Sequence, residues 1–283
     1  GVLSSVNLVV DALFGAGLSR AISGPAREVL EAAENHGLSI ISVDIPSGVD
    51  GDTGEILGYA PTAALTVTFF RPKYGHFLYP GRGHCGETKV VDIGIPETVL
   101  TKIKPQIFAN EPSVWLDAWR PLGPMDHKYS RGHAVILSGP AGKSGAARLA
   151  AAAALRVGAG LVTVASPRGA VAEHAAQLNA IMIDLWRDSA GFRRLLSDPR
   201  RNAVCLGPGA GVGKQLRENV LIALKLEKAT VLDADAITAF ASSRKSLFRK
   251  LHGNCILTPH QGEFGRLFNL GGDRLKVARA AAV

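Results

Sequence analysis

Short apolar runs alternate with segments of helix-like periodicity along most of the chain. The runs that read as strands lie at residues 7–14, 39–44, 64–70, 134–139, 161–166, 203–209, 230–235 and 255–260. Strands that alternate with helices indicate a parallel sheet covered by helices. The alternation lapses at about residues 104–132, which we interpret as a linker. The pattern therefore predicts two α/β domains with separate, mainly parallel sheets, which we place at residues 1–108 and 109–283.

Composition narrows the kinds of molecule that this chain binds. No apolar run is long enough to span a membrane, and the three cysteines lie far apart without the spacing of metal ligands. We therefore expect a cytoplasmic protein with no membrane partner. The net charge of +8 is spread along the chain, and only 6% of residues are aromatic. Without a basic stripe or stacking aromatic residues, small anionic molecules are better candidates than nucleic acid.

A glycine-rich turn separates a strand from an alanine-rich helix in AVILSGPAGKSGAARLAAAAALRVGAG, residues 134–160. A Walker A loop has a glycine six residues before its lysine, but Leu137 occupies that position relative to Lys143. Gly139 is too close to the lysine for the loop to wrap around a phosphate in that way. What remains is a helix N-terminus that favours an anion and that Ser144 is placed to cap, or a plain strand-to-helix turn.

Two aspartates stand at the ends of predicted strands in the first domain. Asp11 ends the strand before a Gly-Ala-Gly turn, and Asp44 ends the next strand, in VDIPSG with Ser47. A carboxylate in an apolar strand is costly unless it is paired, hydrogen-bonded or bound to a cation. The carboxyl ends of neighbouring parallel strands meet at one edge, so we expect a shared, oxygen-rich site that suits a hard cation. Alternatively, both aspartates only cap the turns that follow them.

The motifs VVDALFGAGLSR, SIISVDIPSGVDGDTG and TVTFFRPKYGHFLYPGRGHCGETKVVDIGIP resemble the later part of the NAD(P)H-hydrate epimerase domain. The second half, with GPAGKSGAA, LGPGAG, VLDADAI and LTPHQGEF, resembles the ADP- or ATP-dependent NAD(P)H-hydrate dehydratase domain. The resemblance covers nearly the whole chain. It implies a partial Rossmann-like epimerase domain followed by a partial ribokinase-like α/β domain, fused in one nicotinamide-nucleotide repair enzyme.

The resemblance also implies the substrate and the reactions. The substrate is NAD(P)H hydrated on its nicotinamide ring. The epimerase interconverts the R and S forms of this hydrate, and the dehydratase uses ADP or ATP, with Mg²⁺, to remove the water from the S form.

The same resemblance assigns roles to residues of the first domain. It implies that Asp11 and Ser47 hold a potassium ion and that Asp44 is catalytic and contacts the substrate. The turn after the first strand supplies further substrate contacts, namely Gly15, Ala16, Gly17, Leu18, Ser19, Arg20 and Ala21. Lys73 has three open interpretations: it pairs with Asp44, it binds a phosphate, or it is a solvated loop residue.

In the second domain, the residues implied to contact the hydrated dinucleotide are Ala147, Gly207, Gly209, Gly211, Asp233 and His260. The glycines follow an apolar strand, where missing side chains permit close approach to a ligand. Each feature also has a simpler interpretation: the glycines form a loop, His260 makes local hydrogen bonds, and Asp233 or Asp235 caps the next helix.

The chain departs from the family pattern at both ends. An Asn-Asn-Gly-Gly-Asp-type loop of the epimerase is missing, and so are a lysine-glycine phosphate segment and a Gly-Thr-Gly-Asp turn of the dehydratase. We therefore expect an interior fragment of a bifunctional enzyme, a homo-oligomer when full length, in which residues 1–283 alone have no dehydratase activity. Two other classes of function stay open: a ribokinase-like small-molecule kinase, and a non-catalytic nucleotide- or partner-binding module.

Overall fold

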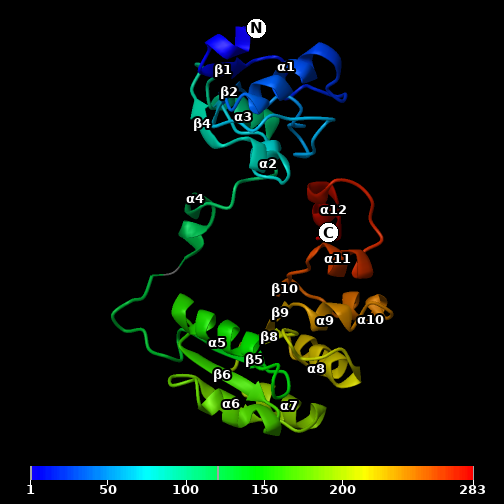
Figure 1. The fold of residues 1–283 in the computed structure, drawn as a ribbon. Helices are drawn as coiled ribbons and strands as arrows, with labels where there is room; N and C mark the ends of the chain where they lie inside the picture. Colours follow the sequence, from blue (N-terminus) through cyan, green and yellow to red (C-terminus); the bar gives the residue numbers. More distant parts are fainter. Residues whose placement is uncertain (1, 120, 283) are drawn as a thin grey trace. The chain divides into compact units, whose positions relative to one another are not determined.

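The computed structural model describes residues 2–119 and 121–282, which separate into two compact units. Unit 1 comprises Gly1–Asp117 and Gly271–Val283, and unit 2 comprises Ala118–Leu270. Each unit contains its own parallel sheet, which confirms the predicted pair of α/β folds (Figure 1). The domain boundary between residues 108 and 109 stays a prediction, because compact units and family domains need not coincide.

Unit 1 is built on a four-stranded parallel sheet in the order β1-β2-β3-β4. The strands are β1 (Leu8–Asp11), β2 (Ser39–Val43), β3 (Leu65–Phe69) and β4 (Glu87–Val91). The α-helices are α1 (Gly24–Asn35), α2 (Gly81–His84), α3 (Thr98–Ile103), α4 (Pro112–Trp115) and α12 (Arg274–Ala281). Short 3-10 turns lie at η1 (Val2–Ser5), η2 (Tyr74–His76) and η3 (Leu116–Ala118).

The register of this sheet determines which side chains meet at its carboxyl edge. Asp11, the last residue of β1, lies opposite Ser42 of β2. Ser42 in turn lies opposite Thr66 of β3. All three of these polar side chains are buried. The loops that leave β1 and β2 therefore start side by side, and this is the edge at which open α/β sheets bind ligands.

Unit 2 is built on a six-stranded parallel sheet in the order β10-β9-β8-β5-β6-β7. Its strands are β5 (His133–Leu137), β6 (Leu161–Ser166), β7 (Met182–Leu185), β8 (Ala203–Leu206), β9 (Ala229–Leu232) and β10 (Cys255–Leu257). From β5 the chain builds outwards through β6 and β7, and it then returns to place β8 on the other side of β5. The strand order therefore reverses between β5 and β8, which is the preferred position for a ligand in such sheets.

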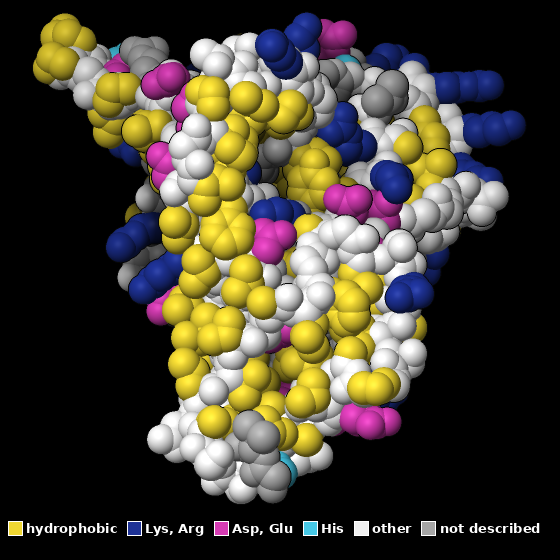
Figure 2. All heavy atoms as spheres, turned by 90° about the horizontal axis from the view of Figure 1, so that it is seen from above, with side chains coloured by type: hydrophobic (Ala, Val, Ile, Leu, Met, Phe, Trp, Pro, Cys, Tyr) yellow, Lys and Arg dark blue, Asp and Glu magenta, His cyan; other side chains and the backbone are white. Residues whose placement is uncertain are grey.

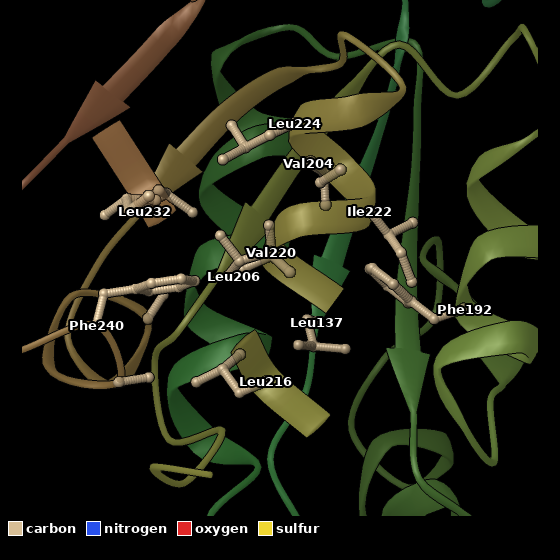
Figure 3. Packing of buried hydrophobic residues seen from close by; sticks show 14 of the residues in the cluster. Leu137, Phe192, Val204, Leu206, Leu216, Val220, Ile222, Leu224, Leu232 and Phe240 are labelled. Carbon is tan, nitrogen blue, oxygen red and sulfur yellow. The ribbon is translucent and has the colours of Figure 1, made fainter. Parts of the chain in front are cut away.

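The helices of unit 2 cover both faces of this sheet. They are α5 (Gly145–Val157), α6 (Val171–Ala175), α7 (Ser189–Leu196), α8 (Lys214–Lys225), α9 (Asp235–Thr238), α10 (Arg244–Phe248) and α11 (Gln261–Leu267), with a short turn η4 (Arg168–Ala170). Ile136 of β5 packs with Ala147 and Ala151 of α5. The larger core lies on the other face, where side chains of α7 and α8 meet the strands, as Figure 3 shows for Phe192, Val220 and Leu206.

Two strands were missing from the sequence prediction. Both β4 and β7 are edge strands, and most of the residues of β4 are exposed. Charged residues interrupt both apolar runs, Glu87 and Lys89 in β4 and Asp184 in β7, and this weakens the pattern by which strands are recognised. Within residues 2–119 and 121–282, no helix is long and apolar enough to cross a bilayer. On the face drawn in Figure 2, Lys and Arg side chains lie in separate groups among apolar and acidic ones.

Candidate functional site

Asp11 is buried at the end of β1 and is fully hydrogen-bonded within unit 1. Its carboxylate accepts hydrogen bonds from the Ser47 hydroxyl at 2.6 Å, from the Ser47 backbone N–H at 2.8 Å and from the Ser42 hydroxyl at 3.2 Å. A longer bond of 3.4 Å comes from the N–H of Leu13. Asp11 thus ties the loop after β2 to the end of β1. Of these four contacts, only the bond from the N–H of Leu13 is a local bond of the kind that caps a turn.

Asp44 lies at the end of β2 in the left-handed backbone region, with φ of 70°. Its Oδ1 forms an ion pair with Lys73 Nζ and accepts a hydrogen bond of 2.9 Å from the Thr68 hydroxyl. Lys73 Nζ also donates to Thr68 Oγ1 at 2.9 Å. Of the three interpretations of Lys73, the structure shows the pair with Asp44. Burial raises the pKa of the Asp44 carboxyl, but the Lys73 and Thr68 hydrogen bonds outweigh it, so the pKa is lowered overall.

The loop after β1 lies against Asp44 and against the loop after β2. The Ala16 backbone N–H contributes to lowering the Asp44 pKa, and a Cβ on Gly15 would lie 3.5 Å from Asp44 Oδ2. Ala16 packs on Gly51, where a Cβ would come within 2.9 Å of the alanine methyl group. The remaining residues of the turn, Gly17, Leu18, Ser19, Arg20 and Ala21, are exposed or half-buried. This turn is therefore accessible beside the Asp44 carboxylate.

The two carboxylates have separate partners, contrary to the expectation of one shared guest. Asp44 is balanced by Lys73, whereas Asp11 accepts hydrogen bonds from hydroxyl and backbone donors. Within residues 2–119 and 121–282, no three His, Cys, Asp or Glu side chains gather as a metal site. The donor set around Ser47 still fits a monovalent cation: Asp11 Oδ1, Ser47 Oγ and the Phe14 carbonyl are hard oxygens that converge there.

In unit 2, two glycine-containing loops meet where the strand order reverses. A Cβ on Gly139, after β5, would lie 1.9 Å from the Gly209 carbonyl oxygen, after β8. A Cβ on Gly209 would lie 2.5 Å from the Lys143 carbonyl oxygen, and one on Gly207 would lie 1.7 Å from the Asp233 carbonyl oxygen. These glycines are therefore required for contact between the protein's own backbones, a reason that the sequence did not reveal.

The two aspartates of VLDADAI point to different neighbouring loops and do not cap α9. Asp233 Oδ1 accepts a hydrogen bond of 2.8 Å from the Thr258 hydroxyl, after β10. Asp235 Oδ2 accepts one of 2.8 Å from the N–H of Gly211, after β8. Ala234 between them has φ of 46° and ψ of −115°, which directs the side chains apart. The loops after three adjacent strands are thus linked through this segment.

His260 is the N-cap of α11 and is exposed. Its Nδ1 accepts hydrogen bonds from the N–H groups of Gly262 and Glu263, at 3.0 and 3.4 Å. Because Nδ1 is an acceptor, the neutral ring carries its proton on Nε2, which lies 3.2 Å from Glu263 Oε1. Ala147, by contrast, is fully buried in the core beneath the turn after β5. The simpler interpretation of His260 as a maker of local hydrogen bonds is therefore at least part of its role.

The turn in GPAGKS is held by a carboxylate of the protein itself. Glu173 of α6 accepts a hydrogen bond of 2.8 Å from the Gly142 N–H and another from the Ser144 hydroxyl. We expected Ser144 to cap α5. It makes no capping hydrogen bond, because its hydroxyl is committed to Glu173. Both hydrogen bonds lower the pKa of Glu173, and the bond from Ser144 has the larger effect. The anion that this turn favours is supplied internally, which agrees with rejecting the Walker interpretation.

Sequence reasoning missed several polar side chains that support these loops. They are Thr68, His76, Glu173 and Thr258. Thr68 and Thr258 have no local signal, since they reach their partners only across neighbouring strands. Glu263 was visible, because a Glu three residues after the His260 cap is the pattern of a capping box.

Comparisons with known proteins also find two parts of the chain, but the second match extends into residues 271–283, which belong to unit 1. Residues 134–283 match the family model described as NAD(P)H-hydrate dehydratase, and residues 2–75 match the model of the YjeF-related protein N-terminus. Two relatives called bifunctional NAD(P)H-hydrate repair enzyme Nnr come from Thermofilum pendens and Moorella thermoacetica. They are 34% and 35% identical, over 99% and 96% of this chain and 54% of each relative. The chain thus spans about half the length of these relatives.

Among solved structures, the ADP/ATP-dependent NAD(P)H-hydrate dehydratase of Bacillus subtilis, co-crystallised with ATP and Mg²⁺, is similar at 23% identity with a TM-score of 0.45. The alignment covers 58% of this chain and 57% of that one. The dehydratase family model spans more than half of the residues and includes every loop described above for unit 2. The chain therefore belongs to the NAD(P)H-hydrate dehydratase family.

Proposed function

We propose that this chain is part of a bifunctional enzyme that repairs hydrated NAD(P)H. Unit 1 would interconvert the R and S forms of the hydrate, and unit 2 would remove water from the S form with ADP or ATP and Mg²⁺. The two family matches along one chain support this pairing, since residues 2–75 of unit 1 match one model and residues 134–270 of unit 2 lie within the match to the other. The relatives matched over nearly all of this chain are called bifunctional repair enzymes.

The observation that carries the epimerase proposal is the Asp44–Lys73 pair beside an accessible glycine turn. The Asp44 carboxylate and the Lys73 ammonium lie at the carboxyl edge of the sheet, where a substrate can reach both. Asp44 would act on the substrate as an acid–base group. The turn from Gly15 to Ala21 would bind the substrate, and Asp11 with Ser47 would hold a potassium ion that adds a fixed positive charge near it.

For the dehydratase, we propose a substrate site at the reversal of strand order in unit 2. The residues proposed to line it come from the loops after β8, β9 and β10, with Ala147 of α5 buried beneath the turn after β5. The lining residues are Gly207, Gly209, Gly211, Asp233 and His260. The linked hydrogen bonds of Asp233 and Asp235 support this proposal, because they hold these loops in one arrangement. We further propose that the full-length protein is a cytoplasmic homo-oligomer.

The experiment follows the two reactions separately on purified R and S hydrates of NADH. Asp44→Asn keeps the shape of the side chain but removes its charge and its basicity. We expect the rate of epimerisation to fall by at least about 100-fold, as is usual for the loss of an acid–base group. The exposed Asp52 provides the matched control, and Asp52→Asn is expected to epimerise at the rate of the unaltered chain.

Epimerisation by Asp44→Asn at the unaltered rate would remove Asp44 from the mechanism. An unaltered chain that fails to interconvert the two forms would refute the epimerase proposal itself. Recovery of NADH absorbance from the S form with ATP or ADP tests the dehydratase. The same measurement on residues 1–283 alone tests our expectation that this segment has no dehydratase activity.

A further inference from the structure

The geometry points to His76 as a positioning residue that holds the Asp44–Lys73 pair in place through the backbone of both residues. This inference rests on the proposed epimerase function for its catalytic consequence. Its structural part, that His76 sets the geometry of the pair, stands on the contacts of unit 1 alone.

His76 is 6% exposed and bridges the two segments that carry the pair. Its Nδ1 accepts a hydrogen bond of 2.9 Å from the Lys73 backbone N–H. Its Nε2 lies 2.9 Å from the Asp44 carbonyl oxygen, which can only accept, so Nε2 carries the proton and donates. The neutral ring with its proton on Nε2 therefore satisfies both contacts at once.

Both ends of this bridge control the geometry of the ion pair. Asp44 is in the left-handed region, so its side-chain direction depends on a backbone conformation that needs support from its surroundings. The His76 bond to its carbonyl oxygen gives that support. At the other end, the bond to the Lys73 N–H sets where the lysine side chain begins, and the lysine then reaches Asp44 Oδ1 and Thr68 Oγ1.

The packing of the neighbouring residue prevents this loop from shifting as a whole. The N–H of Gly75 donates to the Gly51 carbonyl oxygen at 2.9 Å. A Cβ on Gly75 would lie 2.7 Å from the Asp50 carbonyl oxygen and 2.8 Å from the side chain of Ile45. The loop that carries Lys73 therefore lies directly on the loop that follows Asp44, and His76 links the two from within.

The ring must stay neutral to make this bridge, because a second proton on Nδ1 would face the Lys73 N–H donor. Burial lowers the pKa of His76, and the nearby Lys73 charge lowers it further. The backbone bond to Asp44 and the Asp44 charge act in the opposite direction, and the pKa remains lowered overall. The charges of Lys73 and Asp44 both shift the pKa of His76, so the pair and its bridge are electrostatically coupled.

The test reads the pair directly, without relying on catalysis. The Asp44 carboxyl is titrated by ¹³C NMR in the unaltered chain, in His76→Phe, and in Lys73→Met, which removes the cation. Phe fills the volume of the ring but makes neither hydrogen bond. We expect His76→Phe to raise the apparent pKa of Asp44 by at least half of the rise that Lys73→Met produces. His76→Gln, whose amide can replace the Nε2 donor, is expected to restore part of the original value.

The same variants are then measured in the epimerisation assay, which tests the effect of His76 on catalysis. We expect kcat to fall by about 100-fold in His76→Phe while KM changes little, since misplacing a reacting group by about 1 Å costs that much. The matched control is His133→Phe in unit 2, because His133 is also 6% exposed and bonded through Nε2, to Thr163. It should leave both the Asp44 titration and the epimerisation rate unchanged.

An Asp44 titration that is the same in His76→Phe as in the unaltered chain would overturn the proposal. An effect of His76→Phe no larger than that of His133→Phe would overturn it as well. Should His76→Phe not fold, His76→Leu, which also makes neither hydrogen bond, carries the same comparison, and an unchanged pKa and an unchanged kcat in that variant count against the bridge. A chain that shows no epimerisation would refute the proposed function, while the NMR titration would still decide the role of His76.

Discussion

At the scale of single residues, two unusual backbone conformations lie beside the carboxylates of the candidate sites. Asp44 has φ of 70°, and Ala234, between Asp233 and Asp235, has φ of 46° with ψ of −115°. Aspartate tolerates the left-handed region because its short polar side chain can form local hydrogen bonds, but alanine has no such compensation. The strain at Ala234 is therefore borne by the surrounding loops, which direct one aspartate to Thr258 and the other to Gly211.

Replacing Ala234 by glycine is expected to stabilise unit 2. Relief of the strain, about 1–3 kcal/mol, exceeds the cost of the more flexible unfolded chain, about 0.4–1 kcal/mol, so we expect a net gain of about 1 kcal/mol. Urea unfolding measures this difference. The control is Ala239→Gly, since Ala239 has ordinary helical angles of −61° and −21° and should lose stability instead. Equal losses in the two variants would show that Ala234 is not strained.

At the scale of elements, a short helix determines the conformation of the glycine turn after β5. Helix α6 has only five residues, yet its Glu173 holds Gly142 and Ser144, and its His174 lies 2.8 Å from the Ser138 hydroxyl. The turn is thus held on its α6 side by two adjacent residues. A helix N-terminus that would attract a free anion instead receives a carboxylate from its own unit.

Removing this carboxylate is expected to loosen the turn without unfolding the unit. In Glu173→Ala, the Gly142 N–H loses its acceptor, so its hydrogen exchange should become clearly faster than in the unaltered chain. Hydrogen exchange followed by NMR or mass spectrometry measures this change. The control is Glu28→Ala on α1, where the glutamate is exposed, and the exchange at Gly142 should then stay as it was. Unchanged protection in Glu173→Ala would mean that α6 does not hold the turn.

At the scale of the whole molecule, three buried histidines make the stability of both units depend on pH. They are His76 in unit 1 and His133 and His174 in unit 2. Burial is the largest influence on each, and it lowers the pKa of all three from the ordinary value of 6.5. The unfolded chain therefore binds more protons than the folded one at pH values just below 6.5.

The stability that these histidines contribute decreases as the pH falls. Because the folded pKa values lie below the unfolded one, the contribution of these histidines is complete above pH 6.5 and is lost as the pH falls through the folded values. We expect the urea midpoints of both units to fall between pH 7 and pH 5, before most carboxylates are protonated. His133→Phe should reduce the slope for unit 2. Midpoints that stay constant over this range would contradict the prediction.

Much of the fold could be predicted from the chain because its elements follow from local patterns. Apolar runs bounded by turn residues marked eight of the ten strands formed by residues 2–119 and 121–282, including β6 at Leu161–Ser166, which matches residues 161–166. The carboxyl ends of these strands also indicated where Asp11, Asp44 and Asp233 would lie. The edge strands β4 and β7 were missed, because Glu87 and Lys89 in one and Asp184 in the other interrupt their apolar runs.

Local patterns in the chain were enough to predict the two parallel α/β sheets and the strand ends at which polar residues gather. They did not predict which of those residues become partners, because the partners meet only in the folded chain. There Asp44 pairs with Lys73 and both contact Thr68, the Asp11 carboxylate accepts hydrogen bonds from Ser42 and Ser47, and Glu173 reaches the glycine turn. Periodicity is a property of neighbouring residues, whereas these partners of the aspartates and of Glu173 are 24 or more positions apart and meet only once the strands have paired.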